Sequence, residues 1–275
     1  MRNYAPVAGD ALRFLSESPL KTPQSLQALI DDGVIDEVLR PLKSGKEAAV
    51  YVVRSGDDVR CAKVYKDMAQ RSFQQRVQYQ EGRKVRGSRE ARAIGKATKY
   101  GRKQQETAWK NTEVDALYQL RAAGVRVPEP HGYFHGVLVM ELVTDGEGFS
   151  APRLGEVELT DDQARTFHRV LVRQVVRMLC CGLIHGDLSA FNVLWWRDRA
   201  VLIDFSQTVE IVTHPAAHDL LVRDITSLAR YFVRRGVTFD IDRVMERIGA
   251  DVHRFTRQLG DVRVAGRRAP ERWRD

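Results

Sequence analysis

The chain has 275 residues, 43% hydrophobic and 29% charged, a composition that excludes a disordered protein and allows one large domain or two lobes. No uncharged apolar run approaches the roughly 18 residues of a membrane-spanning helix, and residues 1–20 lack the apolar core of a secretory signal, so we expect a cytoplasmic protein without membrane association. Its three cysteines, Cys61, Cys180 and Cys181, are too few for a disulfide framework or a zinc site.

The net charge of +8 is concentrated in one segment. Residues 67–105 hold eleven Lys or Arg against three Asp or Glu, so this segment alone carries +8 and the remainder sums to zero. Such a segment can bind RNA or an acidic partner, or it can be a solvated basic loop. The composition leaves both interpretations open.

Two helical patterns precede the first strands, at Gly9 to Ser16 and at Pro23 to Leu39. Gly33 interrupts the second pattern and predicts a break near that point. We therefore expect residues 1–40 to form a helical extension that packs on the following domain.

From Leu42 the hydrophobic pattern changes to a period of two, which is typical of strands. A turn of small residues, Ser44 to Ala48, separates two strand-like runs, and Ser55 to Asp58 leads into a third run, Val59 to Tyr65. The first turn lacks both the Gly-x-Gly-x-x-Gly and the P-loop spacing. Taken alone, it is weak evidence for phosphate binding.

Alternation in the third run places Lys63 on one face with Val59, Cys61 and Tyr65. An ammonium group on a mainly apolar face is costly unless it has partners, and nucleotide phosphates with a carboxylate would provide them. The alternative is an edge-strand lysine that reaches water.

The helix predicted at Glu106 to Ala123 carries a carboxylate on its buried face. Glu113 shares that face with four apolar residues, Trp109, Ala116, Leu117 and Leu120. Pairing between Glu113 and Lys63 would compensate both buried charges.

An extended connection, Val125 to Pro130, leads to the apolar run Val137 to Leu142, which resembles a core strand entering a linker between two lobes. Backbone groups at Glu141 to Val143 could then face an adenine ring. Residues 163–181 have apolar side chains at helical spacing, which we interpret as core. Two more helices are predicted at His218 to Arg235 and at Ile241 to Ile248.

A short stretch after that core helix, Ile184 to Asn192, contains His-Gly-Asp, with Asn192 five residues after Asp187. Asp204 ends an apolar run twelve residues after Asn192, and a predicted hairpin brings the two side by side. Phosphoryl transfer of the protein-kinase kind requires this spacing. Asp187 would accept the proton of the attacking hydroxyl, while Asn192 and Asp204 would hold Mg²⁺ against the nucleotide phosphates.

Together these motifs resemble the RIO family of atypical protein kinases, in the branch without an N-terminal winged helix. The resemblance covers most of residues 40–232 and rests on the following segments: Ser44-Gly45-Lys46-Glu47-Ala48, Ala62 to Lys66, Val137 to Glu141, His185 to Asn192, Ile203 to Gln207, His214-Pro215 and Arg223-Asp224.

This resemblance implies an α+β, two-lobed protein-kinase-like fold, with a small antiparallel-sheet N-lobe and a reduced, mainly helical C-lobe. The expected units are the extension 1–40, an N-lobe at 41–143 with the basic insertion 67–105, a C-lobe at 144–253 and a basic tail at 254–275. It implies serine phosphorylation with ATP and Mg²⁺, or Mn²⁺ in its place. The expected nucleotide-binding residues are Ser44, Gly45, Lys46, Glu47, Ala48, Val50, Cys61, Lys63, Met140, Glu141 and Leu142.

Family members also carry an autophosphorylated insertion at the position of the basic segment, which makes Ser72 and Ser88 candidate sites. In archaea and eukaryotes the family is tied to maturation of the small ribosomal subunit, so a ribosomal particle is a candidate partner. Two residues depart from the family pattern, Ala190 after the catalytic-loop serine and Cys61 two residues before the lysine. Both bear on substrate choice and pocket shape.

Two alternatives to a protein kinase remain at this point. A small-molecule kinase of the aminoglycoside or sugar type shares His-Gly-Asp and a downstream Asp, but usually has a large helical insert for its acceptor. An RNA- or ribosome-binding factor that uses ATP as a switch would dock through residues 67–105, and its RNA affinity would depend on salt.

Overall fold

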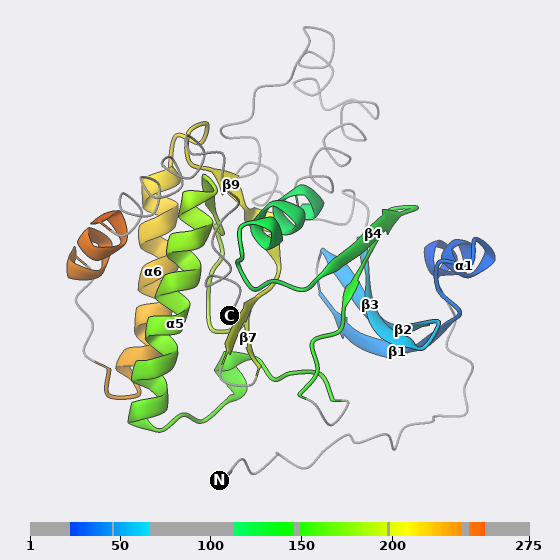
Figure 1. The fold of residues 1–275 in the computed structure, drawn as a ribbon, viewed down its shortest axis with the longest axis horizontal. Coiled ribbons are helices and arrows are strands. Elements are labelled where there is room, and N and C mark those ends of the chain that lie inside the picture. The colour runs from blue at the N-terminus through cyan, green and yellow to red at the C-terminus, as the bar shows by residue number, and fades with distance from the viewer. Residues whose placement is uncertain are drawn as a thin grey trace, which may run out of the picture.

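The computed structural model describes residues 23–45, 47–65, 113–145, 149–196, 199–237 and 242–250. These residues form two lobes, an antiparallel sheet on one side and the helices α5 (Asp161–Cys180) and α6 (Ala217–Val233) on the other (Figure 1). The predicted α+β, two-lobed kinase-like fold is confirmed. Lys46, the basic segment 67–105 and the tail 254–275 lie outside the described residues.

Helix α1 (Gln24–Asp31) is shorter than the helix predicted at Pro23 to Leu39. It ends at the predicted break, because Gly33 adopts the left-handed backbone conformation (φ 68°) that favours glycine. The chain then extends into strand β1 (Glu37–Ser44), so the helical prediction for residues 32–39 was wrong. Pairing with the neighbouring strand outweighs the helical period there.

The N-lobe sheet is antiparallel and has five strands in the order β1-β2-β3-β5-β4. Its remaining strands are β2 (Ala48–Ser55), β3 (Asp58–Tyr65), β4 (Pro130–Phe134) and β5 (Val137–Glu141). Helix α1 covers one face, where Leu26 and Leu29 pack in one buried cluster with Ala62 of β3. Because successive strand residues face opposite sides, Cys61 and Lys63 face the C-lobe instead.

The C-lobe core forms where the sequence predicted it. Thr160 caps α5 through a hydrogen bond from the Gln163 amide to its hydroxyl (3.3 Å), and Asp161 and Asp162 in the first turn complement the helix dipole. The face of α5 that we expected in the core is buried at Phe167, Leu171, Gln174, Val175, Met178 and Leu179, and partly buried at Val170. The buried residues among them belong to the same cluster as the buried face of α6, except Gln174, whose side chain is polar.

Two small antiparallel sheets of two strands each lie between the N-lobe and the helices (Figure 1). Strand β6 (Leu183–Ile184) pairs with β9 (Val209–Glu210), and β7 (Val193–Trp196) pairs with β8 (Arg199–Leu202). The second pair is the predicted hairpin, which therefore brings the residue before β7 next to the residues after β8. Among the described residues no helix is both long and apolar enough to cross a membrane.

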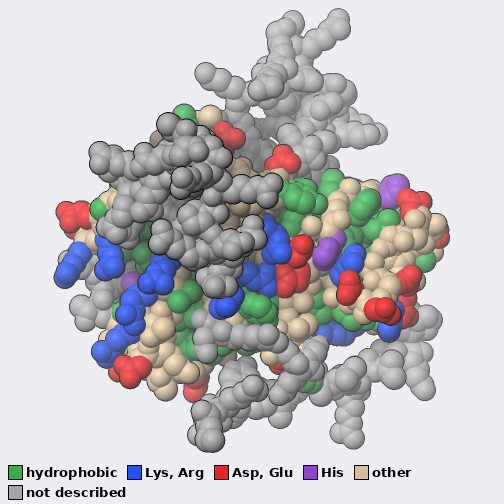
Figure 2. Space-filling view, viewed as in Figure 1, with side chains coloured by type: hydrophobic (Ala, Val, Ile, Leu, Met, Phe, Trp, Pro, Cys, Tyr) green, Lys and Arg blue, Asp and Glu red, His purple; other side chains and the backbone are tan. Residues whose placement is uncertain are grey.

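Positive side chains also gather outside the basic segment. Figure 2 shows Lys and Arg side chains over the helical lobe. On α5 the described residues include three exposed arginines, Arg165, Arg169 and Arg173.

Candidate active site

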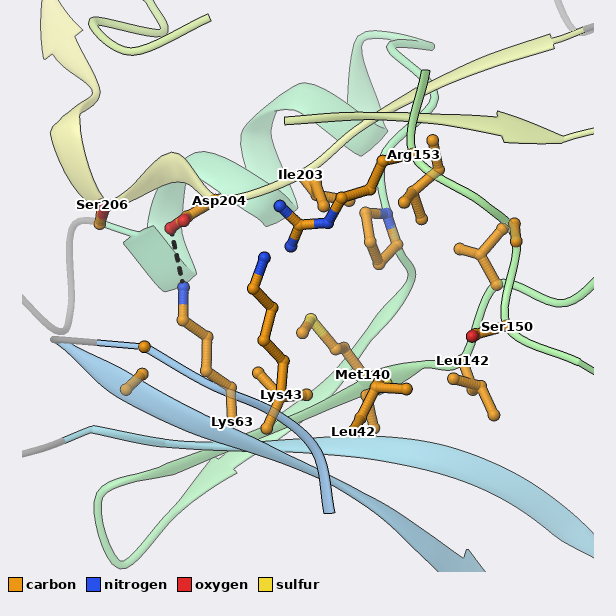
Figure 3. A pocket seen from close by; sticks show the side chains of 18 of the residues that line it. Leu42, Lys43, Lys63, Met140, Leu142, Ser150, Arg153, Ile203, Asp204 and Ser206 are labelled. Atoms are coloured by element: carbon orange, nitrogen blue, oxygen red, sulfur yellow. Dashed lines mark hydrogen bonds and ion pairs between the residues drawn. The ribbon is translucent and has the colours of Figure 1, made fainter. Parts of the chain in front are cut away.

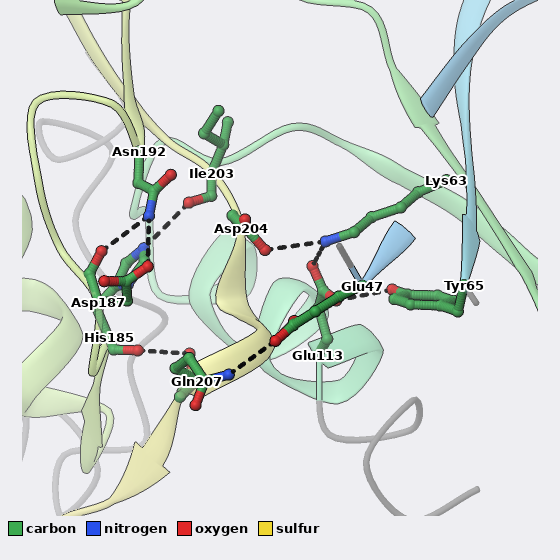
Figure 4. Close-up of polar contacts among 11 residues, drawn as sticks. Glu47, Lys63, Tyr65, Glu113, His185, Asp187, Asn192, Ile203, Asp204 and Gln207 are labelled. Atoms are coloured by element: carbon green, nitrogen blue, oxygen red, sulfur yellow. Dashed lines mark hydrogen bonds and ion pairs between the residues drawn. The ribbon is translucent and has the colours of Figure 1, made fainter. Parts of the chain in front are cut away.

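The side chain of Lys63 connects three parts of the chain. Its ammonium donates to Glu113 Oε1 (2.6 Å) and to Asp204 Oδ1 (3.1 Å), and Tyr65 donates to the other oxygen of Glu113 (2.8 Å) (Figure 4). Lys63 and Glu113 are both buried, so each charge has its counter-ion within a desolvated site. The pairing predicted from the sequence is present.

Helical residues 113–122 place Glu113 opposite the sheet. The predicted buried face of this helix is confirmed for Ala116, Leu117 and Leu120, each of which is at most 3% exposed. Trp109 lies outside the described residues. These apolar contacts hold the helix against the core and thereby place the Glu113 carboxylate within reach of Lys63 on β3.

The charge balance around Lys63 keeps its ammonium and the Asp204 carboxylate ionised. Burial by itself lowers the pKa of Lys63, but Asp204 and Glu113 outweigh it and raise that pKa above the ordinary value. The Lys63 ammonium in turn lowers the pKa of the Asp204 carboxyl to about 2, against the opposing effect of desolvation. Asp204 is therefore a carboxylate across the physiological pH range.

Asp204 follows β8 with a left-handed backbone (φ 68°), which is uncommon for a residue with a side chain. The preceding Ile203 donates its amide to the carbonyl oxygen of Asn192 (3.0 Å), and His185 Nε2 lies 3.1 Å from the carbonyl of Ile203. The segment that carries Asp204 is thus tied to the His-Gly-Asp stretch and to the start of β7.

Gly186 is required by its surroundings. Its φ of 79° suits glycine, and a Cβ atom there would lie 2.2 Å from the carbonyl oxygen of Gln207. The buried carboxylate of Asp224 in α6 accepts hydrogen bonds from the amides of Gly186 (2.8 Å) and Leu188 (3.0 Å), and Arg223 donates to the Gly186 carbonyl. Helix α6 therefore holds the backbone on both sides of Asp187.

The side chain of Asp187 is exposed to the cleft, while α6 holds the backbone on both sides of it. Asn192 donates through Nδ2 to the Asp187 carbonyl oxygen (2.8 Å) and to its carboxylate (3.2 Å). Desolvation, with a smaller contribution from Asp204, raises the pKa of Asp187 despite His185 and Arg223. The amide oxygen of Asn192 points away from Asp187 (Figure 4), which leaves a hard oxygen ligand available beside Asp204.

These groups border a cleft of about 1040 Å³ between the lobes. Most of the residues predicted for nucleotide binding line it: Gly45, Glu47, Ala48, Val50, Cys61, Lys63, Met140, Glu141 and Leu142, with Asp187 and Asp204 opposite them. Ser44 is not part of the lining, and Lys46 lies outside the described residues. Glu113 and Asn192 act from behind the lining through Lys63 and Asp187.

Sequence reasoning missed several residues of this region. Lys43, Arg153 and Arg223 line the cleft, and Asp224 supports the Asp187 loop, although none of them was named as a site residue. For Asp224 a signal existed, because an acidic residue on the buried face of an amphipathic helix needs a partner. Arg223 belongs to the Arg223-Asp224 segment of the family resemblance, whereas Lys43 and Arg153 had no such local signal.

Arg126 fixes the linker between the lobes. Its guanidinium binds both oxygens of Glu141 (2.6 and 2.8 Å) and lies over the Trp196 ring (4.7 Å). Its backbone accepts from the Leu202 amide (3.0 Å) and donates to Gln174 Oε1 (3.0 Å). The C-lobe therefore holds the end of β5 through one residue.

A lysine of the sheet lobe that reaches both a helix glutamate and an aspartate of the other lobe is the arrangement found in protein kinases. The His-Gly-Asp loop, with Asn192 five residues after Asp187, adds the second half of that arrangement. The fold and the site together define a kinase with a protein-kinase-like architecture.

Comparison with known proteins specifies the family. The sequence model of the RIO domain matches residues 49–244, more than half of the chain. The RIO-type serine/threonine-protein kinase Rio1 of Haloferax volcanii is 35% identical over 228 residues, which cover 82% of this chain and 74% of that protein. The protein of the same name from Methanocaldococcus jannaschii is 32% identical over 79% of this chain and 70% of its own length. Serine/threonine-protein kinase rio1 of Schizosaccharomyces pombe is 31% identical over 81% of this chain, but only 44% of its own length is covered. The chain belongs to the RIO family.

The Lys63–Glu113 pair can be tested by substitution. Lys63→Ala should abolish phosphoryl transfer, and Glu113→Ala should reduce kcat/KM by about a hundredfold because the ammonium loses its fixed position. Tyr65→Phe is the matched control, since it removes the hydroxyl that donates to the other Glu113 oxygen and leaves the Lys63–Glu113 pair in place, so it should keep most activity. Steady-state kinetics with thermal melts would check this, and unchanged turnover of folded Glu113→Ala would contradict the pairing.

The Arg126–Glu141 pair should stabilise the protein in a pH-dependent manner. Burial opposes ionisation of Glu141, but hydrogen bonds from Arg126 and the Glu129 amide give a net lowering of its pKa from 4.5. A lowered carboxyl pKa adds stability above pH 4.5 that is lost as the pH falls through the lowered value. Arg126→Met should therefore reduce the free energy of unfolding by about 1–3 kcal/mol at pH 7 and by less at pH 3.

A double-mutant cycle with Glu141→Gln, followed by chemical denaturation at both pH values, would measure this coupling. Equal losses at pH 3 and pH 7 would show that Arg126 acts through packing on Trp196 alone.

Proposed function

We propose that this protein is a serine/threonine kinase that transfers the terminal phosphoryl group of ATP to a protein hydroxyl with the help of Mg²⁺. The observation that carries the proposal is the placement of Lys63, Asp204 and Asp187 along one cleft, with Glu113 and Asn192 behind them. The names of the Rio1 relatives support the same activity and acceptor.

The base in this proposal is Asp187. It is exposed to the cleft, its backbone is held by α6, and its raised pKa makes it a better proton acceptor than an ordinary aspartate. As the acceptor oxygen forms its bond to the terminal phosphorus, its proton passes to Asp187 and the bond from that phosphorus to the bridging oxygen breaks, releasing ADP. Lys63 holds the phosphates in line during this transfer.

A divalent cation fits the donor set beside Lys63. Asp204 is ionised, and the amide oxygen of Asn192 points away from Asp187, so both offer the hard oxygen ligands that Mg²⁺ or Mn²⁺ prefers. When bound, the metal would neutralise phosphate charge. The chain's own contribution is to keep the Asp204 carboxylate deprotonated and in place through the bond from Lys63.

The adenine ring would occupy the apolar end of the cleft. Cys61 and Met140 are register partners on β3 and β5 and line the cleft with Leu142 and Val50. Burial raises the pKa of the Cys61 thiol to about 12, so it remains a neutral apolar surface for the base. The Glu141 side chain is bound to Arg126 and the Glu141 amide donates to the Glu129 carbonyl (2.8 Å), so adenine contacts in this linker would come from other backbone groups.

A protein acceptor is favoured over a small molecule by the segment after β5. Residues 149–160, which lead to α5, contain only the 3₁₀ turn Leu154–Glu156, so this described part of the chain forms no large helical insert for a small acceptor. Autophosphorylation and slow ATP hydrolysis without an acceptor are expected side activities. An RNA or ribosomal partner would bind through residues 67–105.

The two aspartates should separate in binding experiments. Asp187→Ala should lose phosphoryl transfer but keep Mg²⁺-dependent ATP affinity, because the base is gone and the phosphate contacts remain. Asp204→Ala should lose both activity and the Mg²⁺-dependent part of the affinity. Calorimetric titration of ATP with and without Mg²⁺ into both variants measures this division, and the opposite pattern would exchange the two roles.

Autophosphorylation should occur in the basic segment 67–105, at Ser72 or Ser88. Both lie outside the described residues, and their candidacy rests on the hydroxyl group and the family resemblance. Phosphopeptide mapping after incubation with ATP would locate the sites, with Asp187→Ala protein as the control that should remain unmodified. Phosphate found only outside this segment would refute the assignment.

A further inference from the structure

Two cations converge in the cleft from opposite lobes. Lys43 extends from β1, Arg153 extends from the segment before the turn Leu154–Glu156, and their side chains point toward one another beside Asp204 (Figure 3). Neither side chain forms an ion pair or donates a hydrogen bond to any residue that the structure describes. The other lining cations are engaged, Lys63 with two carboxylates and Arg223 with the Gly186 carbonyl.

Both cations stand on backbone that is paired within the fold. Lys43 pairs with Val50 in the β1–β2 ladder, directly after a register shift between Pro41 and Lys43. Arg153 forms a bridge with Leu194 of β7, and its amide donates to Glu156 Oε2 (3.1 Å). The fold of each lobe therefore places the two residues at the cleft, where Lys43 is exposed and Arg153 is partly buried.

The juxtaposition is electrostatically unfavourable in the free protein. Burial and the charge of Arg153 lower the pKa of Lys43, while Glu156 and Asp204 act in the opposite direction. Asp204 is bound to Lys63, and Glu156 accepts a hydrogen bond from the Arg153 amide, so neither carboxylate forms an ion pair with the side chain of Lys43 or Arg153. Two like charges without a counter-ion between them are a site for a polyvalent anion.

The location selects which anion fits. In Figure 3 Lys43 lies between Lys63 and the apolar end of the cleft, where Leu42, Met140 and Leu142 are drawn. A nucleotide with its base at that end and its terminal phosphate at Asp204 would run its phosphate chain past Lys43 and Arg153.

We propose that Lys43 and Arg153 form a second phosphate clamp, which grips the phosphate chain of the nucleotide from both lobes. This inference rests on the proposed function, because it takes a nucleoside di- or triphosphate as the ligand. The clamp is separate from Lys63 and does not use the metal ligands. Its binding draws the sheet lobe and the helical lobe toward each other, since each lobe supplies one cation.

The clamp predicts a distinct pattern of affinities. Lys43→Met and Arg153→Met should each weaken ATP and ADP binding by about tenfold, in the presence of EDTA as well as Mg²⁺, because each removes a charge-assisted hydrogen bond to phosphate. Adenosine affinity should change by less than about twofold, since it has no phosphate to bind. Lys43→Arg should retain binding, and Arg165→Met on the exposed surface of α5 is the control for loss of a distant positive charge.

Equilibrium titration of adenosine, ADP and ATP into the full chain would test this, with circular dichroism to show that each variant is folded. Folded variants that bind ADP and ATP as tightly as the unmodified protein does would overturn the clamp. That outcome leaves the proposed kinase function intact. Failure of the unmodified protein to bind ATP at all would overturn both.

Discussion

The buried ammonium of Lys63 is the interaction on which the arrangement of this protein depends. A charge at that depth is stable only with counter-ions in place, and its two carboxylates come from segments far away in the sequence, the helix 113–122 and the end of β8. The packing of that helix and the closure of the C-lobe hairpin must therefore place Glu113 and Asp204 around the same ammonium group. The contacts that fold the two lobes thus also assemble the site.

The opposite wall has an equivalent constraint in Asp224. Its carboxylate is almost fully buried and is satisfied by backbone amides on both sides of Asp187, so α6 determines the shape of the His-Gly-Asp loop. Gly186 is needed because the loop passes within contact distance of Gln207. Asp187, the proposed base, thus stands on an irregular segment whose backbone has little freedom.

How much the sequence predicts depends on whether a signal is local. The β7–β8 hairpin, the buried face of α5 and the Lys63–Glu113 pair follow from periodicity and from the cost of burying a charge. The helix predicted through Leu39 failed because residues 37–44 have a partner strand that no local pattern reveals. Arg126, Lys43 and Arg153 gain their significance only from neighbours brought close by the fold, and isolated basic residues in a sequence usually indicate solvent exposure.

Two aspartates in one cleft acquire different chemistry from their surroundings. Asp204 has an ammonium at 3.1 Å that lowers its pKa to about 2, which favours a permanently charged ligand and disfavours proton exchange. Asp187 has an amide as its closest side-chain partner, and the nearby charge of Asp204 helps to raise its pKa. Two carboxylates in a shared site shift each other's pKa apart, so a deprotonated Asp204 makes Asp187 more basic. The position of Lys63 on the Asp204 side of the cleft therefore supports the proposal that Asp187 acts as the base.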